Sequence, residues 1–340
     1  NANMRIKEVQ IDTTGTLAEV LYKFSAESGM DLPFKIAGDG EAALRDNQKT
    51  LSLSSLQGFV SDKKITLQSP LNISQTGDEI RVDPFNVTLG NGQIKGDALI
   101  LTERINANIA IQSLPLDLLN LINPDAPVSG AVNAQASLIV TPNSSDGSVS
   151  AELVDVVLKG PDYQGIPALS SQLSATLAAG KLNFEGSVSG LTATTVTASG
   201  NIPVDIALAP LGVTVSDDAP LEMALDANSN LDKLWPLLGL DRHLVNGTLI
   251  AKGDVTGTLT TPQITGEVQL RDGRYEEIEL GTIIEQLQFS AVVQEGDKVA
   301  LTASGVDGPL LGADTGVAWS SGTMPSRPNA TSRRALGLVG

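Results

Sequence analysis

The sequence predicts an all-β protein with two short helices, built from divergent repeats into an elongated antiparallel sheet that forms an open β-groove. Apolar and polar residues alternate in many segments, and short turn signals separate these segments. Aromatic residues make up only 3% of the 340 residues, whereas 33 residues are glycine. A chain of this length exceeds the usual size of one compact core, and its apolar residues are mainly small and aliphatic. An extended sheet with a thin apolar layer fits both facts.

The alternation is clearest in residues 248–259. Successive side chains of a strand point to opposite faces, so this segment has one apolar and one polar face. Antiparallel pairing is expected, because parallel sheets are usually buried on both faces. The same pattern occurs in residues 105–111, 182–188 and 264–270.

Turn signals rich in Gly, Asp and Asn divide the chain into hairpins. They lie at residues 38–40, 76–78, 90–92, 146–147, 179–181, 272–273 and 295–297. Pro84 interrupts one strand and the apolar residues change parity there, which predicts a bulge or bend.

Two leucine-rich segments, residues 114–122 and 231–240, break the alternation and predict short helices limited by prolines. A strand entry containing a glycine follows each, and aligning Gly130 with Gly247 gives an offset of 247 − 130 = 117 residues. Gly180 and Gly296 give 116, and Thr-Ala-Ser-Gly recurs at 197–200 and 302–305. We interpret these matches as an internal repeat. The predicted divisions are a β segment at 1–112, a helix with β-hairpins at 113–229, a partial copy at 230–305, and a disordered or non-native tail at 306–340.

The composition excludes several classes of partner and chemistry. Lysine and arginine total 22 against 39 acidic residues, a net charge of −17 that disfavours binding to nucleic acid. The absence of cysteine excludes disulfides and thiolate catalysis and fits a bacterial periplasm. No apolar run is long enough for a spanning helix, and the sequence opens within a patterned strand, so we expect a targeting signal upstream.

Nothing in the sequence predicts an enzyme, a cofactor or a metal site. The single histidine, His243, lacks the setting of a catalytic triad and is interpreted as a surface turn residue. The acidic pairs at 217–218 and 276–277 resemble a glycosidase dyad only in composition, and adjacent strand residues face opposite ways, so both pairs are expected to be solvated.

The apolar face itself is the strongest functional signal, because small inward residues leave room for a ligand. An open apolar trough is a candidate site for acyl chains or for an extended polypeptide. The alternative is a filled β-solenoid core, in which small residues match a narrow cross-section. The residues predicted to line a lipid groove are Leu182, Phe184, Val188, Leu249, Val255, Leu259, Ile264, Val268, Leu270, Leu287 and Phe289.

Residues 245–266, 270–275 and Gly281 follow a recurring sequence pattern, in which the chain resembles the TamB family and its AsmA-like relatives. Residues 113–116 followed by Gly130, and residues 96–99, look similar. The resemblance covers about residues 1–305. It depends on the order in which these sequence patterns follow one another rather than on any single motif.

The resemblance implies a β-taco with an apolar groove and a role in the translocation and assembly module. It implies a periplasmic location for a parent protein anchored in the inner membrane, and an outer-membrane barrel partner, TamA. It further implies outer-membrane protein assembly, autotransporter secretion and phospholipid transport. Three classes of function remain open: a groove that conducts lipid, a scaffold that binds client β-strands, and a structural solenoid or adhesin segment without a ligand groove.

Overall fold

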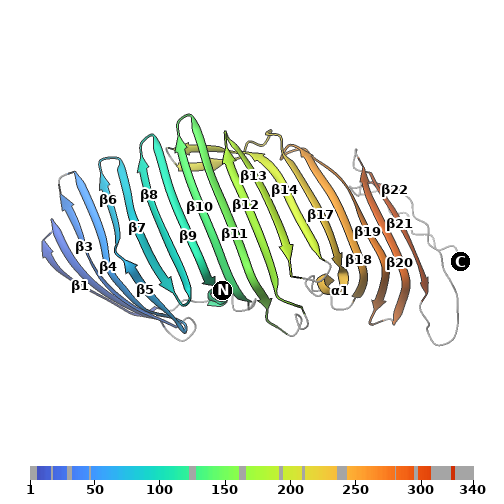
Figure 1. Cartoon of the computed structure of the whole chain (residues 1–340), viewed down its shortest axis with the longest axis horizontal. Coiled ribbons are helices and arrows are strands. Elements are labelled where there is room, and N and C mark those ends of the chain that lie inside the picture. Colours follow the sequence, from blue (N-terminus) through green and yellow to red (C-terminus); the bar gives the residue numbers. More distant parts are fainter. Residues whose placement is uncertain are drawn as a thin grey trace. The chain divides into compact units, whose positions relative to one another are not determined.

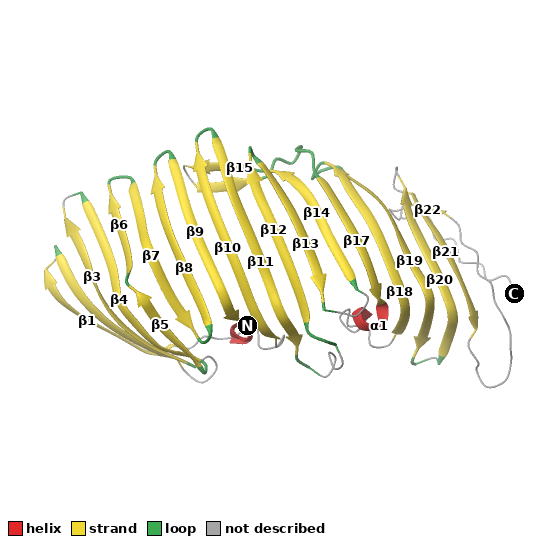
Figure 2. Ribbon diagram, in the orientation of Figure 1, coloured by secondary structure: helices red, strands yellow, loops and turns green. Residues whose placement is uncertain are grey.

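The computed structural model describes residues 6–16, 18–28, 33–45, 47–121, 128–160, 166–190, 194–208, 211–235, 243–279, 281–294, 298–307 and 323–325. These residues form strands β1–β22 and two short helical segments, and every pairing between described strands is antiparallel (Figure 2). The prediction of an all-β antiparallel fold is confirmed. The chain divides into two compact units, residues 1–190 with 201–216 (unit 1) and residues 191–200 with 217–340 (unit 2).

Unit 1 is a sheet in which strands pair with their neighbours in chain order from β1 to β13 (Figure 1). β5 and β6 are two halves of one strand position, because both pair with β4 and both pair with β7. The register shifts between Val82 and Phe85, which confirms the bulge predicted at Pro84. The bounds are β1 Ile6–Thr16, β2 Glu19–Ser28, β3 Phe34–Arg45, β4 Gln48–Val60, β5 Lys63–Ser69, β6 Leu71–Thr76, β7 Glu79–Leu89, β8 Gly92–Leu101, β9 Arg104–Pro115, β10 Val128–Thr141, β11 Ser144–Leu158, β12 Leu169–Ala178 and β13 Lys181–Ser189.

A separate two-stranded hairpin also belongs to unit 1. It consists of β15 (Asp205–Leu208) and β16 (Leu211–Thr214), which pair only with each other among the described strands. β14 (Thr195–Pro203) precedes it and crosses the division between the units.

Unit 2 repeats the antiparallel arrangement, with the six strands β17 to β22 pairing in chain order. The short β22 pairs with Lys298–Ala300 of β21, a contribution to the sheet that the sequence did not predict; the rest of the predicted tail from residue 308 lies outside the described residues. The bounds are β17 Glu222–Asn230, β18 His243–Gly257, β19 Pro262–Glu277, β20 Thr282–Gln294, β21 Lys298–Asp307 and β22 Thr323–Pro325.

Both predicted helices exist, with shorter bounds (Figure 2). The first is a 3-10 helix, η1 (Leu116–Leu121), and Leu114 and Pro115 instead end β9. The second is α1 (Leu231–Leu234), capped by the Asn230 side chain, which accepts a hydrogen bond from the Asp232 backbone N–H. The predicted continuation to residue 240 lies outside the described residues after Trp235.

Turn signals predicted the hairpins only in part. Residues 77–78, 90–91 and 179–180 are turns, but residues 38–40, 146–147 and 272–273 lie inside strands. Gly38 is needed for close approach rather than for a turn, because a Cβ there would lie 2.8 Å from the Phe24 ring on β2. The predicted turn at 295–297 lies outside the described residues.

The internal repeat has a structural counterpart in two matched bulges. Gly130 on β10 and Gly247 on β18 both have φ = 127°, and the register shifts beside each of them. On the strand that follows, Asp155 and Asp272 both adopt left-handed backbone conformations, with φ of 51° and 50°. The offsets are 247 − 130 = 117 and 272 − 155 = 117. The Asp272-Gly273 signal is therefore a repeated bulge, not a turn.

The bulge resets the alternation of the strand that carries it. Leu270 and Tyr275 are five residues apart and would face opposite ways in a regular strand, yet both belong to one hydrophobic cluster with Val245. Leu153 and Leu158 flank Asp155 with the same spacing and the same 117-residue offset. By this alignment β21 corresponds to β13, since 298 − 181 = 117, so the Thr-Ala-Ser-Gly match between β14 and β21 does not mark equivalent positions.

Candidate functional site

The apolar face of unit 2 is assembled by the strand register. Residues directly opposite each other in an antiparallel pair share a face, so each cross-strand row can be followed from one strand to the next. One row runs through Ala227, Ala251, Val268, Ala291 and Leu301, and the next through Ser229, Leu249, Leu270, Phe289 and Ala303. The polar face carries charged neighbours, among them Lys252, whose Nζ lies 3.1 Å from Asp226 Oδ2.

One end of this face is filled. Leu231 of α1, Val245 and Leu270 are buried, and Trp235 packs against them together with Leu249, Tyr275, Leu287 and Phe289. The Trp235 indole N–H donates a hydrogen bond to the His243 backbone carbonyl. We call the end of the strands that lies beside η1 or α1 the helix end. Four predicted groove residues, Leu249, Leu270, Leu287 and Phe289, thus belong to a packed core at the helix end.

His243 is the first residue of β18 and is half-buried, so the prediction of a surface turn residue is wrong. Its Nδ1 lies 3.0 Å from the Tyr275 hydroxyl, and the two rings stack with centroids 6.0 Å apart. The histidine therefore braces two paired strands beside the Trp235 core.

The opposite end of the apolar face in unit 2 is open. Ile264 is 56% exposed, Leu259 is 48% exposed and Val268 is 37% exposed, while Val255 is half-buried beside Ile264 in the register. Met223 and Leu225 of β17 join this surface, because they pair with Val255 and Gly253. The predicted lining residues of unit 2 therefore fall into two groups, a packed group at the helix end and an exposed group away from it.

Unit 1 has a longer face of the same kind. From β8 to β13 one row runs through Gly96, Ile109, Ala136, Val149, Ala175 and Phe184, and the next runs through Ile94, Ile111, Ala134, Ala151, Leu173 and Gly186. Ile109, Val149 and Leu173 are 44%, 42% and 45% exposed. Of the predicted residues here, Leu182 and Phe184 are half-buried and Val188 is exposed. The sequence prediction missed the exposed central residues, although the alternation in residues 105–111 marks that strand.

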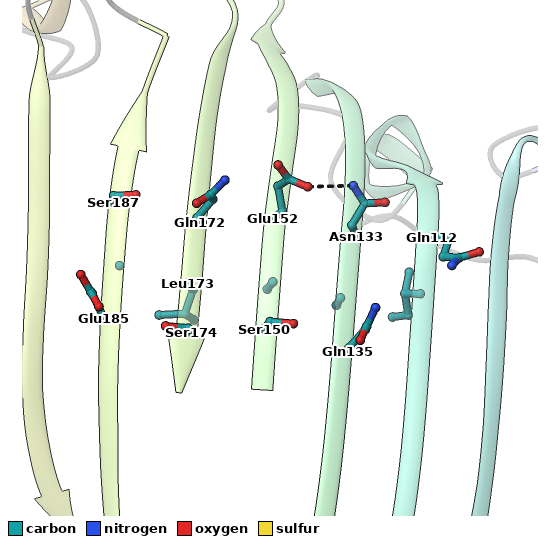
Figure 3. Close-up of a pocket in the computed structure, with 14 residues that line it drawn as sticks. Gln112, Asn133, Gln135, Ser150, Glu152, Gln172, Leu173, Ser174, Glu185 and Ser187 are labelled. Atoms are coloured by element: carbon teal, nitrogen blue, oxygen red, sulfur yellow. Dashed lines mark hydrogen bonds between the residues drawn. The ribbon is translucent and has the colours of Figure 1, made fainter. Parts of the chain in front are cut away.

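Two cavities lie along these rows. One, of about 580 Å³ (Figure 3), follows the row from Ile111 to Gly186, but nine of its fourteen lining residues are the polar neighbours of that row in each strand, among them Asn133 and Glu152. Because neighbouring residues of a strand face opposite ways, this cavity lies mainly against the polar face of the sheet. The other, of about 650 Å³, is lined in the same way along the row from Phe85 to Ala175. In Figure 3 the lining residues come from adjacent strands, and the Asn133 amide donates a 3.1 Å hydrogen bond to Glu152.

The backbone N–H and C=O groups beneath the apolar face of unit 1 take part in the hydrogen bonds of the sheet. Each strand from β7 to β12 has a hydrogen-bonded neighbour on both sides. A ligand lying across these strands meets aliphatic side chains and no unpaired sheet edge. Such a surface recognises apolar shape rather than hydrogen-bonding pattern.

The remaining chemistry is sparse within the described residues. They contain no group of three or more His, Cys, Asp or Glu side chains that could hold a metal ion. Asp217 and Asp218 are exposed as predicted, whereas Glu277 is buried and Glu276 pairs with Arg274 at 2.9 Å, so the second acidic pair is not fully solvated. No helix in the described part of the chain has the length and apolar character needed to cross a membrane.

No protein-family model and no curated protein sequence matches this chain. The resemblance to the TamB family therefore stays a hypothesis, and the functional argument depends on the geometry of the apolar face.

Proposed function

We propose that this chain is a periplasmic, bridge-like segment of a TamB-type subunit that carries phospholipid acyl chains on its apolar face. In this proposal the parent protein is anchored in the inner membrane, works with the barrel subunit TamA, and supports outer-membrane protein assembly and autotransporter secretion. The observation that supports lipid carriage is the run of exposed aliphatic side chains over a sheet whose backbone groups are paired.

The paired backbone favours an acyl chain over an extended client strand as ligand. A single extended peptide laid across β7–β12 would bury its own N–H and C=O groups without partners, and each unsatisfied group costs about 1–3 kcal/mol. An alkyl chain carries no such groups and gains about 25 cal/mol for each Å² of apolar surface removed from water. The net charge of −17 disfavours close contact with anionic headgroups, so the headgroups are proposed to stay in water while the chains lie on the face.

The test compares two adjacent residues of β19 that point to opposite faces. Val268 lies in the apolar row, and Gln269 lies on the polar face. Purified wild-type protein should carry phospholipid detectable by mass spectrometry. Val268→Asp should lower the bound lipid at least fivefold with a normal circular dichroism spectrum, because this partly exposed position lets the carboxylate stay hydrated. Gln269→Asp should retain both lipid and fold.

Each other result has a defined meaning. Wild-type protein without lipid, or a folded Val268→Asp variant with normal lipid content, would overturn the proposed lipid route. Unfolding of Val268→Asp would support the filled solenoid, because an unpaired charge in a closed core is strongly destabilising.

A further inference from the structure

The hairpin β15–β16 covers one margin of the apolar face in unit 1. The Val204 backbone N–H donates a 2.8 Å hydrogen bond to the Gly180 carbonyl in the β12–β13 turn, and β15 contacts β10. Val204 itself is buried, and Ile206 and Leu208 are half-buried. The hairpin is therefore docked onto the sheet through apolar side chains.

The sheet at this margin contains the two most deeply buried apolar residues among the described residues of unit 1, Val140 and Ile105. Val140 is 1% exposed, and Ile105 and Leu177 are also buried. Val140 pairs with Ile105, and Leu177 lies near the same end of its strand, two residues from the β12–β13 turn. Four residues along β9 from Ile105, Ile109 is 44% exposed. Burial thus falls abruptly between the covered margin and the middle of the same strand.

The opposite margin is closed by η1. Leu116 is buried, and Asp117 Oδ2 lies 2.9 Å from Lys63 Nζ at the start of β5. The exposed apolar residues of the middle rows, Ile109, Val149 and Leu173, therefore lie between a covered margin at each end of the strands.

We infer that β15–β16 and η1 are the two side walls of an acyl-chain site in unit 1 that runs across β8–β13, and that Ile206 and Leu208 make the hairpin wall. This inference rests on the proposed function and adds a specific location, boundary and chain orientation to it. The walls select against a bulky or polar occupant, because only the aliphatic middle rows are accessible and the strands beneath them have no free edge.

The orientation follows from where the exposed residues lie. Ile109, Val149 and Leu173 belong to three different strands but to two adjacent rows. A chain that contacts all three must lie across the strands. A chain lying along a strand would instead run into Ile105 or Leu116, which are already buried.

The experiment uses a photoreactive phenylalanine analogue placed at Leu173 in unit 1 or at Val268 in unit 2, in the full chain. Each protein is mixed with phosphatidylcholine vesicles, irradiated, and examined for lipid adducts by mass spectrometry. The double variant Ile206→Ser/Leu208→Ser undocks the hairpin wall. The matched control is Ala207→Ser, which changes an exposed residue between Ile206 and Leu208 that points to the opposite face of the hairpin.

Adducts should form at both probe positions in the parent protein. The double variant should lower the Leu173 adduct at least threefold and leave the Val268 adduct unchanged, whereas Ala207→Ser should change neither. If neither position forms an adduct, the proposed function fails. If Val268 reacts and Leu173 does not, the unit 1 site is wrong while the function stands.

Two further outcomes test the wall itself. An unchanged Leu173 adduct in a double variant whose hydrogen exchange at Val140 has increased would show that the hairpin covers the margin without confining lipid. If Val140 stays protected, the serines have not undocked the hairpin, and a variant that replaces residues 205–214 by a glycine–serine linker gives the same two outcomes.

Discussion

The two units share a pair of β-bulges beside a short helix, but different side chains cover the sheet around them. In both, a short helix precedes a strand that contains a glycine at φ = 127°, and the next strand contains an aspartate with a left-handed backbone conformation. The glycines of the two units are 117 residues apart in the sequence, and so are the aspartates. In unit 2 the helix end is filled by Trp235 and a packed cluster, and the far end leaves Ile264 exposed. In unit 1 the far end is covered by β15–β16, which buries Val140.

This difference shows which part of the repeat is structural and which part is adaptable. The bulge resets strand alternation beside the helix, so apolar residues on both sides of it reach one cluster, as Leu270 and Tyr275 do. Among the described residues, the strand ends away from the helix have no matched bulge. There the apolar face is covered by β15–β16 in unit 1 and exposed in unit 2. Ligand specificity is therefore expected to vary at the far end while the helix end stays packed.

The largest expected effect comes from removing the Trp235 side chain from the packed cluster at the helix end of unit 2. Trp235→Ala should destabilise unit 2 by about 2–3 kcal/mol, because a large, partly buried ring is lost from a cluster that cannot fully collapse. Hydrogen exchange of the backbone around Val245 should accelerate accordingly. Leu119→Ala in η1, where the side chain is 52% exposed, is the matched control and should change exchange in unit 1 little. Equal effects would show that the two helices are not packed differently.

Much of this fold could be predicted from the sequence, because period-two alternation reports directly on which side chains share a face. The strands around residues 105–111, 182–188, 248–257 and 264–270 all follow that pattern. The Asp-Gly signals misled the prediction at residues 146–147 and 272–273, since the same dipeptide serves a turn or a bulge depending on the partner strand. The residues around the dipeptide do not show which strand will pair with it, so the sequence alone could not distinguish a turn from a bulge.

The candidate site was predictable as a face but not as a bounded site. Alternation identified Val255, Ile264 and Val268, which are accessible or half-accessible, together with Leu249 and Leu270, which are packed. The difference depends on α1 folding back onto the face. Residues 205–214 likewise gave no sign of covering Val140, because a four-residue strand pairing only with its own hairpin partner leaves little periodic signal.

A smaller effect tests whether the two bulges are equivalent. Gly130→Ala and Gly247→Ala should each cost about 1–3 kcal/mol, because both positions have φ = 127° and an added Cβ would lie about 3 Å or less from backbone atoms. The two losses, measured by urea denaturation with hydrogen exchange to separate the units, should agree within about 0.5 kcal/mol. Gly77→Ala is the control for a positive φ in the left-handed helical region without steric crowding: φ is 58° with open space around the Cβ position, and its cost should be about 1 kcal/mol. Unequal losses at Gly130 and Gly247 would mean that the shared φ does not reflect a shared environment.

The smallest effect concerns how η1 is held in unit 1. The Asp117 carboxylate, and then Asp62, raise the pKa of Lys63 above its usual 10.5 through hydrogen bonds to the ammonium group. Because the pKa is higher in the folded state, the stabilisation is fully present below about pH 10.5 and is lost as the pH rises through the folded-state pKa. Lys63→Met should therefore cost about 1 kcal/mol near pH 8 and progressively less toward pH 12, measured as the difference in unfolding free energy from wild type. Lys64→Met, which changes an exposed lysine of the same strand, is the matched control and should change the unfolding free energy little near pH 8. If the Lys63→Met difference stays constant across this range, the lysine contributes packing rather than charge, and η1 is held to the sheet by Leu116 in the way that Trp235 holds α1.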